Sequence, residues 1–282
     1  MLLNINLPLF VYGLFKPGQL AYRQIERLVD GTPQPALVNG ELYIRDGLPL
    51  FSPLDTDNAI KGYILKFKTN EAQHAYKIVA DFEPEKHYKW DQIEVPETKQ
   101  KANILIGEKP EKGSILLEHI NDWSGSLDPV FTSAMKLVKE TAEDYGRAPF
   151  QGDLLESDWI RLFRLQMGYL LLWSGIERFA AFAYGPKLEP MKKIGSLSKD
   201  PLFQTALQIY VTRTAQITDC RDPNRDYSLD SSDPESSAKF FYQVRNNLSH
   251  RGKGAYKDGE IVRIALLELK DVFQFMLQEG FK

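Results

Sequence analysis

The spacing of apolar residues changes near the middle of this chain. Before Gly107 the apolar residues alternate with polar ones or form short runs, as in Val38–Ile44 and Ile60–Phe67. After Pro129 they recur every three or four residues over long stretches, as in Asp153–Tyr184. Alternation is the period of a half-buried strand, and a spacing of three and four is that of an amphipathic helix. The pattern therefore predicts an α+β protein with a β-rich N-terminal part and a helical C-terminal part.

The N-terminal part is predicted to be a small mixed β-barrel-like domain with two helices. The helices are expected at Ala21–Val29 and Glu71–Phe82, where apolar residues recur at helical spacing. Turn residues such as Asp46-Gly47 separate the predicted strands. These strands are Leu7–Tyr12, Val38–Ile44, Ile60–Phe67, Gln92–Val95 and Ala102–Ile106.

The C-terminal part is predicted to be an all-α helical bundle. Its helices are expected at Val130–Tyr145, Asp153–Tyr184, Pro201–Thr218, Ala238–Ser249 and Glu260–Leu277. Cys220–Ser237 is polar and rich in Ser, Asp and Pro, which indicates an exposed loop. The charged, turn-rich segment Gly107–Gly113 indicates a linker. The predicted boundaries are 1–108 for the first domain, 109–152 for a linker and leading helix, and 153–282 for the helical domain.

Composition narrows the classes of function. The formal net charge is −3 at pH 7, so any contact with RNA must come from a few local side chains. The single cysteine, Cys220, allows neither an intrachain disulfide nor a cysteine zinc site, which fits a reducing, cytoplasmic location. The histidines are scattered, and no metal or other cofactor is expected. Met1–Phe10 lacks the basic start of a signal peptide and Met167–Trp173 is too short to span a bilayer, so no membrane contact is expected.

The main candidate site is the segment from Arg245 to His250. If this segment is helical, Asn246 and His250 lie one turn apart on the same side, and Arg245 borders that side. A guanidinium holds a phosphate with two hydrogen bonds and stays charged. An imidazole titrates near neutral pH and moves a proton to or from the 2′-hydroxyl or the leaving 5′-oxygen of RNA. These groups suit metal-independent RNA cleavage, with Asn246 holding the imidazole or a phosphate oxygen.

A structural alternative remains open for the same residues. Cationic side chains near the end of a helix interact favourably with its dipole and bond its last carbonyl groups. Spacing alone does not separate this role from a catalytic one, because an Arg-x4-His match is short.

Two segments of the helical part resemble the HEPN superfamily. Arg245-Asn-Asn-Leu-Ser-His250 resembles its Arg-x4-6-His signature, and Leu170–Phe179 resembles its core helix with Trp and Glu. The resemblance covers about residues 153–282. It implies a dimeric helical bundle that is an endoribonuclease, with two motifs facing each other across the dimer, or a non-catalytic RNA-binding relative. It further implies a role in a toxin–antitoxin or antiviral system, with an antitoxin as partner.

This resemblance assigns catalytic roles to Arg245 and His250 and a supporting role to Asn246. Glu177 is a further candidate, and its alternative role is an exposed helix position paired with Arg178 or a lysine. The aromatic residues along Asp153–Tyr184 are interpreted as core or dimer interface.

The N-terminal part resembles the γ-glutamylcyclotransferase-like (AIG2-like) family. The segment Phe10–Gly18 resembles its substrate loop, and Val79–Tyr88 resembles the segment that carries its acid. The resemblance implies that the loop Tyr12, Gly13, Leu14 and Phe15 holds a carboxylate, and that Glu83 moves protons as a γ-glutamyl group cyclises. The chain departs from the family at Leu14, where a small hydroxyl residue is usual, at Phe15 and at Pro84.

Three functions follow as hypotheses. The first is an RNA-cleaving helical domain joined to a cyclotransferase-like domain that senses or modifies a small γ-glutamyl or amine ligand. The second is a γ-glutamyl cyclotransferase-type enzyme that its helical domain dimerises. The third is a binding module with neither activity.

Overall fold

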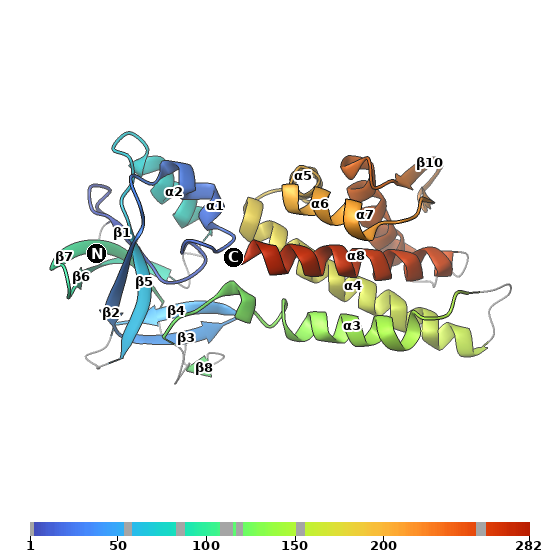
Figure 1. Ribbon diagram of the computed structural model, residues 1–282, viewed down its shortest axis with the longest axis horizontal. Coiled ribbons are helices and arrows are strands. Elements are labelled where there is room, and N and C mark those ends of the chain that lie inside the picture. Colours follow the sequence, from blue (N-terminus) through green and yellow to red (C-terminus); the bar gives the residue numbers. More distant parts are fainter. Residues whose placement is uncertain are drawn as a thin grey trace. The chain divides into compact units, whose positions relative to one another are not determined.

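The computed structural model describes residues 3–53, 58–82, 88–107, 115–116, 121–150, 156–251 and 258–282, without the side chains of 115, 116, 250 and 251. The chain forms two compact units (Figure 1). The first unit comprises Met1–Asp128, Phe182–Lys187 and Phe281–Lys282, and the second comprises Pro129–Ala181 and Leu188–Gly280. The α+β class expected from the sequence is confirmed.

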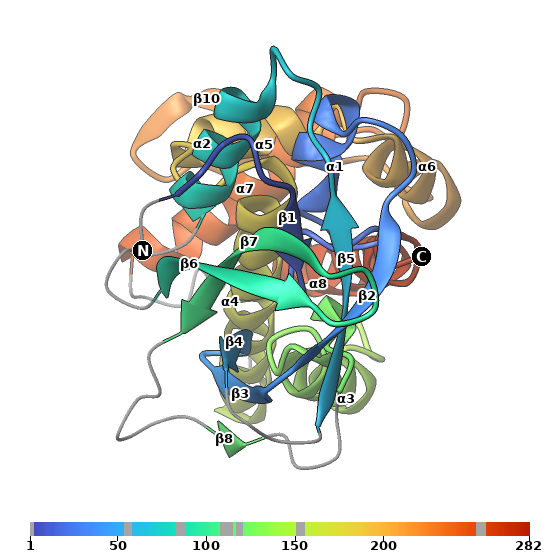
Figure 2. The same ribbon diagram turned by 90° about the vertical axis from the view of Figure 1, so that its left-hand side faces the viewer.

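A five-stranded mixed sheet forms the centre of the first unit (Figure 2). Strand β1 is its middle strand, antiparallel to β5 and parallel to β7. Within the described residues no ladder joins the edge strands β2 and β6, so the sheet is open and the barrel-like prediction was wrong in this respect. The strands, in spatial order, are β2 (Gln34–Asn39), β5 (Ala59–Leu65), β1 (Leu9–Val11), β7 (Gln100–Gly107) and β6 (Tyr88–Val95).

A second sheet contains β3 (Glu41–Arg45), β4 (Leu48–Ser52) and β8 (Ile115–Leu116). Asp46 and Gly47 both have positive φ and form the tight turn between β3 and β4, as the sequence predicted. The single strand predicted over Val38–Ile44 is instead two strands in different sheets, with Gly40 between them. A Cβ at Gly40 would lie 2.4 Å from the Phe51 ring, so the chain changes sheet where only glycine fits.

Short helices complete the first unit: α1 (Tyr22–Ile25), the 3-10 turn η1 (Glu26–Leu28), α2 (Ala72–Phe82) and the 3-10 turn η2 (Gly125–Leu127). Helix α2 places Tyr76 in the core, where its hydroxyl donates to the Leu7 carbonyl at 2.7 Å. The buried Asn103 amide donates to the same hydroxyl and ties β7 to this helix. Both helices predicted for this part are therefore present, the first as one α-turn followed by a 3-10 turn.

In the described residues of the second unit there are six helices (Figure 1). The long helix α4 carries two glycines at close contacts. A Cβ at Gly168 would lie 2.9 Å from Thr141 of α3, and one at Gly175 would lie 2.9 Å from Phe273 of α8. These glycines let α3 and α8 approach α4 closely. The helices are α3 (Ser133–Tyr145), α4 (Glu156–Tyr184), α5 (Pro190–Leu197), α6 (Pro201–Tyr210), α7 (Pro234–Arg251) and α8 (Gly259–Gly280).

A β-hairpin interrupts the helices, so the all-α prediction was wrong. It consists of β9 (Ala215–Asp219) and β10 (Asp222–Leu229), which lie where the sequence suggested the end of a helix and a loop. Helix α6 ends at Tyr210, because the β-branched residues that follow favour an extended chain. The strands are polar on their outer face, and contacts with α7 hold them in place. Such tertiary support is not visible in local periodicity.

In the part of the chain that the structure describes, no helix is both long and apolar enough to cross a membrane.

Candidate functional site

Helix α7 carries the predicted catalytic residues, and it begins earlier than the sequence suggested. Asp233 caps it, accepting a hydrogen bond from the Ser236 amide at 3.0 Å, and Pro234 occupies its first turn. The helix continues without interruption to Arg251. Arg245, Asn246 and His250 therefore lie on one continuous helix.

The apolar side of α7 is buried as predicted. The side chains of Phe240, Phe241, Val244 and Leu248 are all 9% exposed or less. The Phe241 carbonyl accepts a hydrogen bond from the buried Tyr169 hydroxyl of α4 at 2.7 Å. Burial raises the pKa of this tyrosine well above its usual value, so the hydroxyl stays a donor and fixes α7 against α4.

Arg245 leaves this core and meets Glu177 of α4. Its guanidinium Nη2 lies 3.3 Å from a Glu177 carboxylate oxygen, and the two side chains are 31% and 46% exposed. The guanidinium carbon also lies 5.9 Å from the centre of the Tyr242 ring, within reach of a cation–π contact. Among the described residues, Glu177 thus pairs with the candidate catalytic arginine, and not with Arg178 or a lysine as its alternative role assumed.

Arg245 and Glu177 line a cavity of about 230 Å³ within the helical unit. Helices α4, α5 and α7 form its walls, and Lys193 of α5 brings a second cation to it. This cavity was not predicted, because α5 was missed in the sequence. Glu189 in extended conformation followed by Pro190 marks the start of α5, and proline at the first helical position is a recognisable signal.

Asn246 follows Arg245 on α7 and lies about 100° around an ideal helix from it. Asn246 is half-buried and does not line the cavity. The side chain of His250 lies outside the described residues, so only its place on the helix is known. On an ideal helix His250 lies about 40° from Asn246 and about 140° from Arg245. The structure therefore places Arg245 with Glu177, while the backbone places Asn246 beside His250.

Asn247, which the sequence did not single out, fastens α7 to the hairpin. Its amide oxygen accepts from the Cys220 amide at 3.0 Å and from Gln243 at 2.8 Å. Its amide nitrogen donates to the Thr218 carbonyl at 2.9 Å. Asn247 is 3% exposed, and both the oxygen and the nitrogen of its buried amide are hydrogen-bonded. These bonds hold the last turns of α7 in place.

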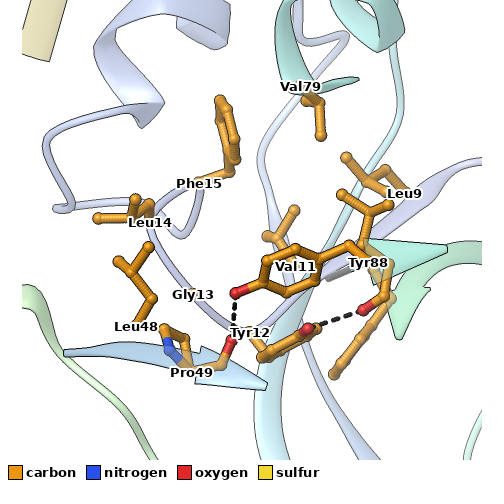
Figure 3. Close-up of a pocket in the computed structure, with 12 residues that line it drawn as sticks. Leu9, Val11, Tyr12, Gly13, Leu14, Phe15, Leu48, Pro49, Val79 and Tyr88 are labelled. Carbon is orange, nitrogen blue, oxygen red and sulfur yellow. Dashed lines mark hydrogen bonds between the residues drawn. The ribbon is translucent and has the colours of Figure 1, made fainter. Parts of the chain in front are cut away.

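The loop Tyr12–Phe15 in the first unit surrounds a much smaller cavity, of about 30 Å³ (Figure 3). Leu14 and Phe15 line it and are 5% and 4% exposed. The Tyr12 hydroxyl is engaged, because it donates to the Leu105 carbonyl at 2.7 Å and accepts from the Phe51 amide at 3.2 Å. A space of this size holds about one water molecule.

Tyr88 crosses this cavity from β6, and its hydroxyl donates to the Pro49 carbonyl at 3.1 Å (Figure 3). Lys16, which follows the loop, is buried and bonds Asp122 and the Trp123 carbonyl. These contacts give the loop a structural role. The proposed acid Glu83 and the following Pro84 lie outside the described residues.

Comparisons with known proteins identify no family for this chain. No family model matches it, and no curated protein does. Among solved structures, an uncharacterized protein from Pyrococcus horikoshii, PH0828, is similar with a TM-score of 0.30 and 14% identity. The similarity covers 39% of this chain and 85% of that one, and it identifies neither a fold nor a function.

Proposed function

We propose that the helical unit binds RNA and cleaves it without a metal ion, as a HEPN-type endoribonuclease. The observation that supports this proposal most is the environment of Arg245. Its guanidinium is partly exposed beside a cavity, and its ion pair with Glu177, at 3.3 Å, is longer than a strong charge-assisted hydrogen bond. An RNA phosphate would therefore displace a weak partner from this guanidinium.

The chemistry assigned to the three residues is a transesterification. The RNA 2′-oxygen forms a bond to phosphorus while the bond from phosphorus to the 5′-oxygen breaks. Arg245 stabilises the charge on the phosphate, and His250 takes the proton of the 2′-hydroxyl or gives one to the 5′-oxygen. Asn246, one turn before His250, orients the imidazole or a phosphate oxygen. The products are a 2′,3′-cyclic phosphate and a 5′-hydroxyl.

Dimerisation would supply the second proton-transfer group. One imidazole serves one step at a time, and a second His250 from another copy of the chain would serve the other oxygen. We therefore propose a homodimer formed through the helical unit, with RNA as substrate and an antitoxin as a further partner.

The test is cleavage of a single-stranded RNA in the presence of EDTA. We expect cyclic-phosphate products from the wild type and a loss of rate of about 10²–10⁴-fold for His250→Ala. Arg245→Ala is expected to lose about 10²–10³-fold. The matched control is Ser249→Ala on the same helix, because the Ser249 hydroxyl is exposed and donates to the backbone carbonyl of Arg245.

Equal rates for wild type and His250→Ala would refute the catalytic role. Binding of RNA without cleavage by any form would instead indicate a non-catalytic relative. Neither binding nor cleavage would contradict the proposal as a whole.

The γ-glutamyl cyclotransferase alternative has less support. The buried side chains of Leu14 and Phe15 line the cavity at the loop. This cavity is far smaller than the roughly 300–1,000 Å³ of typical ligand sites. Release of 5-oxoproline from a γ-glutamyl dipeptide, abolished by Glu83→Gln, would reinstate it.

A further inference from the structure

The cavity between α4, α5 and α7 has walls that suit an apolar molecule. Alkyl and aromatic side chains make up most of its lining: Trp173, Ile176, Ala180, Ile194, Leu197 and Tyr242. The Trp173 and Tyr242 rings pack edge to face, with their centres 5.5 Å apart. Water gains few hydrogen bonds from such walls, so its replacement by a hydrocarbon body is favourable.

The charges of the side chains that line this cavity do not sum to zero. Glu177 and Arg245 form an ion pair and neutralise each other. Lys193 adds a second cation, and its ammonium forms no ion pair or side-chain hydrogen bond within the described part of the chain. The lining therefore carries one negative and two positive charges. An anionic ligand would restore neutrality.

We infer that this cavity is a binding site for a small monoanion with an apolar body, such as an arylalkyl carboxylate. The carboxylate contacts Lys193 and Arg245, and the hydrocarbon lies against Ile176, Ala180 and Leu197. The volume of about 230 Å³ is below that of drug-sized sites, which restricts the ligand to a small molecule.

A nucleobase fits the same cavity less well. Its edge carries several hydrogen-bond donors and acceptors, and burial of these groups against alkyl walls without partners costs free energy. The charged groups of the lining stand on Glu177, Lys193 and Arg245, which suit one charged end of a ligand. The ligand class is therefore a carboxylate with an apolar body.

Ligand binding has a consequence for the proposed nuclease. Arg245 belongs to both sites, so the carboxylate and an RNA phosphate compete for one guanidinium. This consequence alone rests on the proposed function, whereas the binding site itself does not.

The test is calorimetric titration of the full chain with 3-phenylpropionate and with 3-phenylpropan-1-ol. The two probes share a carbon skeleton and differ in charge. We expect the acid to bind at least tenfold more tightly than the alcohol. Lys193→Gln should remove most of this preference, while Lys192→Gln should not, because Lys192 lies next to it, pairs with Glu189 and does not line the cavity.

Two further variants act in opposite directions. Glu177→Gln removes the negative charge of the lining and should tighten binding of the acid several-fold without affecting the alcohol. Ala180→Phe fills the cavity and should abolish binding of both probes. If Ala180→Phe does not fold, the comparison of Lys193→Gln with Lys192→Gln still decides the matter.

The inference is overturned if the chain binds neither probe, if it binds both equally, or if the two lysine variants behave alike. Tighter binding of uridine or adenosine monophosphate than of the acid would overturn the ligand class. If the chain binds the acid but neither binds nor cleaves RNA, the binding site is supported and the proposed nuclease activity is refuted. If the acid binds but does not inhibit RNA cleavage, only the proposed competition for Arg245 is refuted.

Discussion

At the scale of single residues, neighbours on one helix have unlike roles. Asn246 is half-buried and its side chain makes no hydrogen bond with the described residues, while the side chain of Asn247 is buried and makes three. The sequence does not distinguish these adjacent asparagines, because their environments depend on the hairpin that packs against α7. Asn247 therefore holds the helix, whereas Asn246 stays only a candidate in the proposed reaction.

Asn247→Ala is expected to destabilise the chain by about 2–4 kcal/mol, because it leaves the Cys220 amide and the Thr218 carbonyl without their side-chain partner. Asn246→Ala, its matched control, should change the free energy of unfolding by less than about 0.5 kcal/mol. Urea denaturation of both variants measures the difference. Similar values for the two would show that the hairpin contact contributes little.

Glu268 of α8 gives stability a pH dependence. Burial raises the pKa of this carboxyl above its ordinary value of 4.5, and Arg213, 3.0 Å away, opposes the shift only in part. A raised pKa in the folded state contributes stability that is present at low pH and is lost as pH rises through that pKa. Wild type should therefore lose stability relative to Glu268→Gln as pH rises from 4 towards 7.

The measurement is the difference between the melting temperatures of wild type and Glu268→Gln at each pH across this range. Glu235→Gln is the control, since its carboxylate is 66% exposed and pairs with Lys239 on the surface. A difference between wild type and Glu268→Gln that stays flat with pH would contradict the predicted shift.

At the scale of elements, glycine has opposite consequences in two helices. Alanine is favoured over glycine in a helix by about 1 kcal/mol. A Cβ at Gly195 of α5 meets nothing within 4 Å, whereas one at Gly175 of α4 meets the buried Phe273 ring at 2.9 Å. Gly195→Ala should therefore stabilise the chain by about 0.5–1 kcal/mol, and Gly175→Ala should destabilise it by about 1–3 kcal/mol.

Chemical denaturation of the two variants checks this prediction. The substitution is the same and both positions are helical, so the difference reports packing between α4 and α8. Stabilisation by both variants would mean that the Phe273 ring moves aside at no cost.

Elements were predictable where a periodic pattern was long or a turn had a specific chemistry. Helices α2, α3, α4 and α8 and the Asp46-Gly47 turn follow directly from the residues. The hairpin did not, because its outward residues are polar and it is bonded to Asn247, 29 residues after Thr218. In the site, Arg245 and Glu177 were both candidates, but their pairing depends on how α7 packs against α4. Lys193 was not predicted to lie near them, because it belongs to helix α5, which the sequence analysis missed.

At the scale of the whole molecule, the described surface of α4 leaves an apolar stripe exposed. Ile160, Phe163 and Met167 are 64%, 46% and 64% exposed, and their spacing puts them on one side of the helix. The aromatic residues of this helix were expected in the core or a dimer interface. Tyr169, Trp173 and Phe179 are in the core, and Phe163 lies on this stripe.

The stripe fits the proposed homodimer. Antiparallel pairing of two α4 helices about a two-fold axis at Met167 sets Glu156 opposite Arg178, because each lies eleven residues from the centre. Opposite charges then face each other at both ends of an apolar contact, as a self-complementary interface requires.

We therefore expect a dimer by sedimentation equilibrium at micromolar concentrations and a monomer for Met167→Glu, which places two carboxylates at the axis. Ile209→Glu is the control, since Ile209 of α6 is also exposed, at 51%, and lies off the stripe. Loss of RNA cleavage by monomeric Met167→Glu would further show that the two copies act together. A wild type that stays monomeric would remove the homodimer, and with it the second imidazole that the proposed mechanism draws from a partner chain.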